Sequence, residues 1–342
     1  MIECNLQKQK INERKFTMEK LFKLKEHGTD VKTEIIAGIT TFLAMAYILA
    51  VNPSYLGGID GMSAGAVFSA TAISAGIATL CMAFFANYPV ALASGMGLNA
   101  FFAFTVCGAM GYSYKVALTA VFIEGIIFML LSLFKFREAL VNKIPSNLKF
   151  AITAGIGLFI AIIALLNANV VVASESTTVA LGELSSPTVV LSLVGLLIIG
   201  ALQHYKVPGG ILLGILITWV LGIIAQLVGW YVPNPEAGVY SVIPQFSLSS
   251  FEAPKMFQFD FGFIAKNVPA FILIVFTFLY TDIFDTVGTL IGVAEKGKLL
   301  DKDGSLPNAT GALMADAVGT VVGACFGTST VTSYVESSAG VA

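Results

Sequence analysis

The stretch Ala93-Ser-Gly-Met-Gly-Leu-Asn-Ala-Phe-Phe102 lies in a segment apolar enough to span a bilayer, yet it contains two glycines and an asparagine. Glycines two residues apart weaken a helix and let backbone approach a ligand closely. A second stretch, Gly327-Thr-Ser-Thr-Val-Thr-Ser-Tyr-Val-Glu336, alternates Thr and Val, which favours extended backbone over helix. Each stretch therefore predicts a short extended segment followed by a half-helix. The alternative is a pair of helices rich in Gly, Ser and Thr that pack closely.

The start of the second half-helix has a capping pattern. Ser333 is suited to the N-cap, with Glu336 three residues later, which is the capping-box spacing. Non-helical backbone at membrane depth is tolerated only when it is buried in protein or lines a cavity. Paired interrupted segments in two halves of a chain indicate a transporter's substrate site. We therefore predict a cavity where the two half-helices meet.

The composition identifies an integral membrane protein. Of 342 residues, 56% are hydrophobic and 12% are charged, with a mean hydropathy of +0.85. Soluble domains average about 25% charged residues. The four cysteines and two histidines show no metal-ligand spacing. The sequence contains no nucleophile–base pair and no phosphate-binding loop, so we expect neither an enzyme nor a cofactor, a catalytic residue, a metal or a nucleic-acid partner.

Ten segments are long enough, or nearly long enough, to span a bilayer. They are 33–56, 64–87, 90–108, 115–134, 149–167, 188–203, 209–230, 264–293, 308–326 and 327–342. The interrupted third and tenth segments are seven apart. This offset predicts a polytopic all-α membrane protein built as a seven-plus-seven inverted repeat.

Basic residues predict the orientation. Residues 1–32 form a polar tail that contains eight of the 19 Lys and Arg residues, and most of the others fall in loops on the same side. Because cytoplasmic loops carry the excess of Lys and Arg, we place the N-terminal tail in the cytoplasm and loop 231–263 outside. The expected location is the plasma or inner membrane. Because both Met1 and Met18 lie in this tail, either could be the initiator methionine.

Acidic side chains at membrane depth are costly and are functional by default. Asp282 and Asp285 are three residues apart and share one side of a helix. Two close carboxylates repel each other, so we expect the pair to share a proton. Alternatively, either aspartate caps a broken helix or binds backbone. For Asp316, in the ninth span, we expect a supporting role behind the substrate contacts, together with Gly95 and Gly97.

Four motifs resemble one family. They are Ile36-Ala-Gly-Ile-Thr-Thr-Phe-Leu-Ala-Met-Ala-Tyr-Ile48, Gly95-Met-Gly-Leu-Asn-Ala100, Thr281-Asp-Ile-Phe-Asp-Thr-Val-Gly-Thr289 and Tyr334-Val-Glu-Ser-Ser-Ala-Gly340. In this order they resemble the nucleobase–cation symporter family, specifically its azaguanine/hypoxanthine/guanine permease branch. The resemblance covers nearly all of residues 18–342.

The resemblance implies a division into two domains. Residues 33–134 would hold core spans one to four, 135–230 gate spans five to seven, and 264–342 core spans eight to ten. A complete protein of this kind has fourteen spans, so we expect the second repeat to be incomplete, truncated within span ten, and the chain not to transport alone. The resemblance also implies that Asn99, Asp282 and Glu336 contact the purine or couple its transport, and Asp285 matches the second acid of span eight. We therefore expect substrate binding by Asn99, Asp282 and Glu336, and proton coupling by Asp282 and Asp285.

The expected function is the import of purine nucleobases by symport, with hypoxanthine or guanine as substrate and adenine as a further candidate. The coupling ion is expected to be H⁺, with Na⁺ as the alternative. The alternative function is anion transport of the sulfate or bicarbonate type on the same fold. Acids at the site weigh against it, because an anion site between helix N-termini would contain fewer carboxylates. The other expected partner is the lipid bilayer. A homodimer is possible, and the sequence does not decide the oligomeric state.

Overall fold

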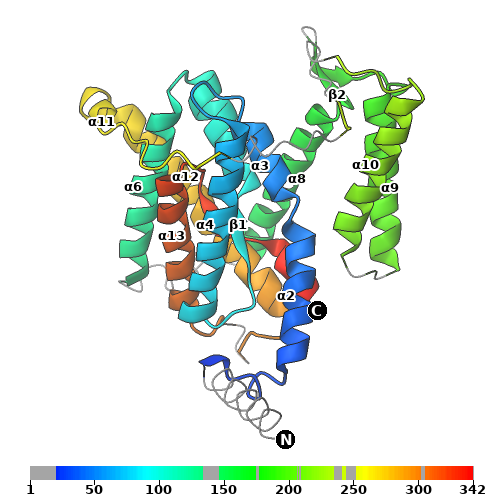
Figure 1. Ribbon diagram of the computed structural model, residues 1–342. Coiled ribbons are helices and arrows are strands. Elements are labelled where there is room, and N and C mark those ends of the chain that lie inside the picture. Colours follow the sequence, from blue (N-terminus) through cyan, green and yellow to red (C-terminus); the bar gives the residue numbers. More distant parts are fainter. Residues whose placement is uncertain are drawn as a thin grey trace, which may run out of the picture.

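The computed structural model describes residues 21–133, 146–174, 177–205, 207, 209–234, 241–243, 252–301 and 305–341. Long helices dominate it (Figure 1). The predicted tail up to residue 20, the loop after the fourth span and part of the predicted outer loop 231–263 lie outside these residues.

In the described residues, seven helical segments are long and apolar enough to cross a membrane. They are α2 with α3 (Val31–Met45 and Ile48–Leu56), α4 (Ala64–Phe85), α6 (Tyr114–Leu133), α9 (Pro187–His204), α10 (Gly210–Leu227), α12 (Val268–Lys296) and α13 (Ala309–Phe326). An eighth apolar helix, α8 (Ser146–Asn167), has 22 residues. These helices match eight of the ten predicted segments and confirm a multi-pass all-α protein.

The third and tenth segments are both interrupted, as predicted. In the third, strand β1 (Leu92–Ser94) precedes α5 (Met96–Ala100), which continues as the π-helix η1 (Phe101–Ala109). In the tenth, strand β4 (Val331–Ser333) precedes the 3₁₀ turn η4 (Val335–Ser337) and α14 (Ser338–Val341). The π-helix was not predicted.

The two short strands pair with each other. β1 and β4 are antiparallel, with Leu92 opposite Ser333 and Ser94 opposite Val331. Both strands are buried throughout. Since unpaired backbone groups at membrane depth cost several kcal/mol each on an order-of-magnitude scale, this pairing is what allows extended backbone in the centre of the bundle.

Helix α13 packs on both α4 and α6, and α12 also packs on α6. Figure 1 shows α13 between α4 and α6. A Cβ added at Gly125 of α6 would lie 2.8 Å from Cγ2 of Val321 in α13. The missing side chain therefore permits the close approach of these helices, as is common between membrane helices.

Two features lie away from this bundle. Helices α9 and α10 pack on each other at one side of the molecule (Figure 1). Strands β2 (Val171–Ser174) and β3 (Thr178–Leu181) form an antiparallel hairpin that was not predicted in the loop after α8. The assignment of spans to a core and a gate stays a prediction.

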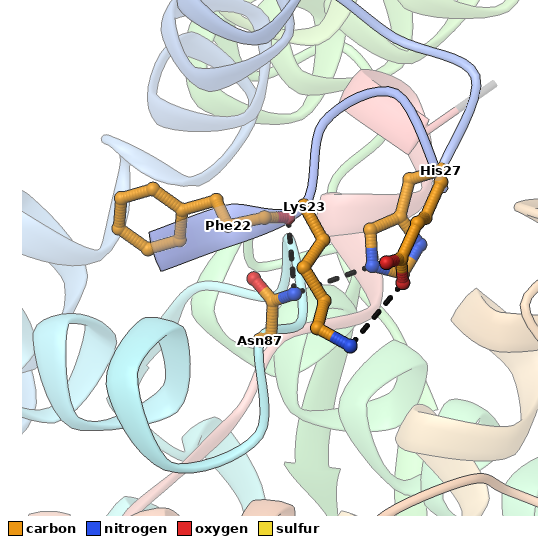
Figure 2. A network of polar contacts seen from close by, with 5 residues as sticks. Phe22, Lys23, His27 and Asn87 are labelled. Atoms are coloured by element: carbon orange, nitrogen blue, oxygen red, sulfur yellow. Dashed lines mark hydrogen bonds and ion pairs between the residues drawn. The ribbon is translucent and has the colours of Figure 1, made fainter. Parts of the chain in front are cut away.

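A polar network fixes the segment before α2 (Figure 2). The amide nitrogen of Asn87, in the turn after α4, donates to the carbonyl oxygen of Phe22 at 3.1 Å and lies 3.2 Å from Nε2 of His27. Lys23 pairs with Glu26 at 3.2 Å. This network holds the N-terminal segment, including His27, against the end of α4.

Candidate functional site

The candidate site lies at the paired strands β1 and β4, where the two half-helices begin. We call this place, at which the two interrupted segments meet, the crossing. The N–H of Gly95 donates to the carbonyl of Thr330 at 3.0 Å, and the N–H of Tyr334 donates to the carbonyl of Ala91 at 3.0 Å. The Tyr334 hydroxyl donates to the carbonyl of Ser94 at 2.5 Å. These bonds join the backbone of the two interrupted segments at both ends of the crossing.

Gly95 is required by the geometry of the crossing. A Cβ at this position would lie 2.6 Å from Cγ2 of Thr332 on the opposite strand, closer than side-chain carbons approach. It would also lie 3.7 Å from Oδ2 of Asp285. The absent side chain therefore lets the strands meet and places the Asp285 carboxylate beside the start of α5. Gly97 lies within α5.

Asn99 is fully buried on α5. Its Oδ1 accepts a hydrogen bond from the Ser329 hydroxyl. Its Nδ2 has no hydrogen-bond partner among the described residues. A buried donor without a partner costs about 1–3 kcal/mol, so this amide is suited to a ligand that offers an acceptor.

Glu336 lies in the first turn after β4 and is half-buried. Its Oε1 accepts a hydrogen bond from the hydroxyl of Tyr47. Tyr47 occupies the break between α2 and α3. Tyr47 belongs to the motif of residues 36–48, but the sequence predicts no role for it, because no local pattern places residue 47 beside residue 336.

The two aspartates of α12 differ in their surroundings. Asp285 is half-buried, lies next to Gly95 and interacts electrostatically with Glu336. Asp282 is fully buried, with Oδ1 3.5 Å from Oγ1 of Thr286. The structure therefore brings Asp285, more directly than Asp282, to the crossing. The roles of both residues stay predictions.

Asp316 holds strand β4 in place. Its Oδ1 accepts the N–H of Ser333 at 3.0 Å, and its Oδ2 accepts the Thr286 hydroxyl at 2.9 Å. Thr286 in turn lies 2.9 Å from the hydroxyl of Thr332. Asp316 therefore lies behind strand β4, and the supporting role expected for it stays a prediction.

The capping-box prediction is wrong. The N-cap of η4 is Tyr334, and it makes no side-chain cap hydrogen bond. The N–H of Ser333 is bound to Asp316, and the Ser333 hydroxyl points to the carbonyl of Thr286 at 3.4 Å. Ser333 thus belongs to the strand, because a partner distant in sequence competes successfully for its backbone.

A buried polar network, which the sequence reasoning missed, supports residues 328–330. Nδ2 of Asn52 donates to the hydroxyls of Thr71 and Thr328, both at 2.7 Å. The Thr328 hydroxyl also lies 2.9 Å from that of Ser94. Asn52 therefore links α3 and α4 to the backbone that presents Ser329 to Asn99.

The site has the character of a polar binding site. Across the described ranges, no group of three or more His, Cys, Asp or Glu residues could hold a metal ion. The arrangement instead offers an amide donor on one half-helix and a carboxylate acceptor on the other. It suits a small polar ligand with both donors and acceptors.

Sequence comparison identifies the family. The sequence profile of the family described as "Permease family" matches residues 32–342. The chain belongs to this permease family. It is accordingly a multi-pass membrane transporter, and the resemblance inferred from the motifs is confirmed.

Three similar proteins illustrate the range of the family. The putative permease MJ0326 of Methanocaldococcus jannaschii is 46% identical over 95% of this chain and 71% of that protein. The guanine/hypoxanthine permease PbuO of Bacillus subtilis is 46% identical over 94% of this chain and 72% of its own length. The adenine permease AdeQ of Escherichia coli K12 is 43% identical over 95% of this chain and 70% of its own length.

Comparison with solved structures confirms the fold class of the permease. The transmembrane domain of the cyanobacterial bicarbonate transporter BicA matches with a TM-score of 0.63 over 91% of this chain and 76% of that chain. The two sequences are 16% identical. This likeness establishes the inverted-repeat fold and nothing about the ligand.

Asp316→Ala should destabilise the permease. The substitution removes two hydrogen bonds to a charged group, each worth roughly 1.5–3 kcal/mol, and leaves the buried N–H of Ser333 without this acceptor. We expect thermal unfolding of the purified protein in detergent to occur at a clearly lower temperature. Asp60→Ala, at an exposed aspartate, is the matched control. Equal unfolding temperatures for the two variants would show that Asp316 does not stabilise β4.

Proposed function

We propose that this permease imports purine nucleobases, with hypoxanthine, guanine or adenine as substrate, by proton symport. The observation that carries the proposal is a pair of polar groups at the starts of the two half-helices, the buried Asn99 and the half-buried Glu336. A purine offers ring N–H donors and nearby acceptors on one flat edge. Glu336 can accept from a ring N–H, and the amide nitrogen of Asn99 can donate to an acceptor.

The comparisons support a purine over other solutes of the same fold. The relatives at 41–46% identity include adenine permeases and guanine/hypoxanthine permeases. The bicarbonate transporter shares the fold at only 16% identity. In addition, Asp285 and Glu336 interact electrostatically beside the crossing. Negative charge at this place would repel an anion and would leave a neutral nucleobase unaffected.

The proposal also includes the membrane, the orientation and the coupling proton. We place the permease in the plasma or inner membrane with a cytoplasmic N-terminus, on the basis of its Lys and Arg distribution. A carboxylate pair in a medium of low dielectric constant is suited to bind a proton together with a neutral substrate. We assign that proton to Asp282 and Asp285 as a coupled pair.

Glu336→Gln should weaken hypoxanthine binding by at least tenfold, because an amide is a weaker acceptor than a carboxylate and can present a donor to the ring N–H. Asn99→Ala should also weaken binding or broaden specificity, since it removes the donor. The measurement is equilibrium binding of radiolabelled hypoxanthine to the purified chain, with competition by adenine, guanine, xanthine, uracil and sulfate. Displacement by sulfate and not by purines would favour the anion-transport alternative, and unchanged affinity in both variants would exclude these residues from the site.

Hypoxanthine binding should strengthen as the pH falls. If the complex takes up one proton, a lower pH favours it, by up to about tenfold in affinity per pH unit. Asp282→Asn and Asp285→Asn should each flatten this dependence, because each removes a member of the pair that shares the proton. Asp60→Asn, at the exposed aspartate, is the control. A hypoxanthine affinity that does not change with pH and requires Na⁺ would contradict proton coupling.

A further inference from the structure

Tyr47 joins the first span to the tenth. Its hydroxyl donates to Oε1 of Glu336, across 289 positions of sequence. Tyr47 lies between α2, which ends at Met45, and α3, which begins at Ile48. The hydrogen bond to Glu336 places the hydroxyl of Tyr47 at the half-helix that follows β4.

The ring of Tyr47 is held by packing. It contacts a buried cluster formed by Met45, Ile48, Ala91, Ala93 and Tyr334, with Met96 at the edge of the same cluster. The other phenol in this cluster, Tyr334, donates its hydroxyl to the carbonyl of Ser94. Tyr47 is therefore the phenol whose donor is directed at Glu336.

This bond leaves Glu336 able to bind a ligand. An ionised carboxylate has about four acceptor positions on its two oxygens, and the hydroxyl of Tyr47 uses one of them on Oε1. A hydrogen bond to a charged acceptor is about twice as strong as a neutral one. Glu336 is thus fixed in one orientation before a ligand arrives, which reduces the entropy lost on binding.

We infer that Tyr47 is a positioning residue for substrate recognition, whose hydroxyl orients the Glu336 carboxylate to accept a ring N–H of the nucleobase. This inference rests on the proposed function. It assigns to the first span a part in selecting N–H donors, in addition to the residues of spans three, eight and ten.

The test compares Tyr47→Phe with wild type in the 342-residue chain. The substitution keeps the ring that packs in the cluster and removes only the hydroxyl. The ligands are hypoxanthine, 1-methylhypoxanthine and 9-methylhypoxanthine, of which each methylated compound lacks one N–H. The readout is the ratio of affinities between hypoxanthine and the methylated compound that wild type binds less well.

Tyr47→Phe should weaken hypoxanthine binding about tenfold, equivalent to about 1.4 kcal/mol, and leave binding of that methylated compound nearly unchanged. The affinity ratio therefore shrinks. Tyr55→Phe is the matched control. It removes, from a tyrosine of α3, a hydroxyl that accepts a hydrogen bond from Asn167 at the end of α8, and it should leave the ratio at its wild-type value. Tyr47→Gln restores a donor without the ring, so its ratio should lie closer to wild type than that of Tyr47→Phe.

Two outcomes overturn the inference. One is a Tyr47→Phe affinity ratio equal to that of wild type, either because both affinities are unchanged or because hypoxanthine and its methylated analogue lose affinity equally, as a purely structural role would produce. If Tyr47→Phe does not fold, a Tyr47→Gln ratio far below wild type has the same meaning. A wild-type chain that binds no purine would instead refute the proposed function.

Discussion

Antiparallel pairing of β1 with β4 is the interaction on which the rest of the structure depends. Six residues of extended backbone lie buried in the bundle, where water is not available to satisfy their N–H and C=O groups. Each strand supplies the partners of the other, so neither interruption is stable alone. The half-helices that carry Asn99 and Glu336 both start from this pairing. The site is therefore assembled from residues that are more than 200 positions apart.

Several side chains support the pairing without taking part in it. Gly95 gives the strands room to approach, and Asp316 fixes the N–H of Ser333 from behind. Asn52 and Thr328 connect the backbone before β4 to α3. The hydroxyl of Tyr47 donates a hydrogen bond to Glu336. The donor and acceptor groups of the site are consequently held by neighbours in other spans, as a selective polar site requires.

Local sequence was sufficient for the spans and for their interruptions. Two glycines near Asn99 and the Thr/Val alternation of residues 330–332 oppose helix in an otherwise apolar segment, and such signals depend only on neighbouring residues. The capping box failed for the opposite reason. Ser333 has the right spacing to Glu336, but its N–H binds the carboxylate of Asp316, and this contact depends on the fold. The contacts of Tyr47 and Asn52 are also long-range, and no periodicity in one sequence reveals them.

The most direct test of the account asks whether a purine occupies the crossing. Met96, at the start of α5, is half-buried beside Ala93 and Tyr334. In a chain whose four cysteines are replaced, Met96→Cys would be alkylated with a membrane-permeant maleimide, with Ser54→Cys at an exposed position of α3 as control. The account predicts that hypoxanthine slows alkylation at position 96 several-fold, that sulfate does not, and that position 54 is unaffected by either. An unchanged rate at position 96 while hypoxanthine is bound would contradict it.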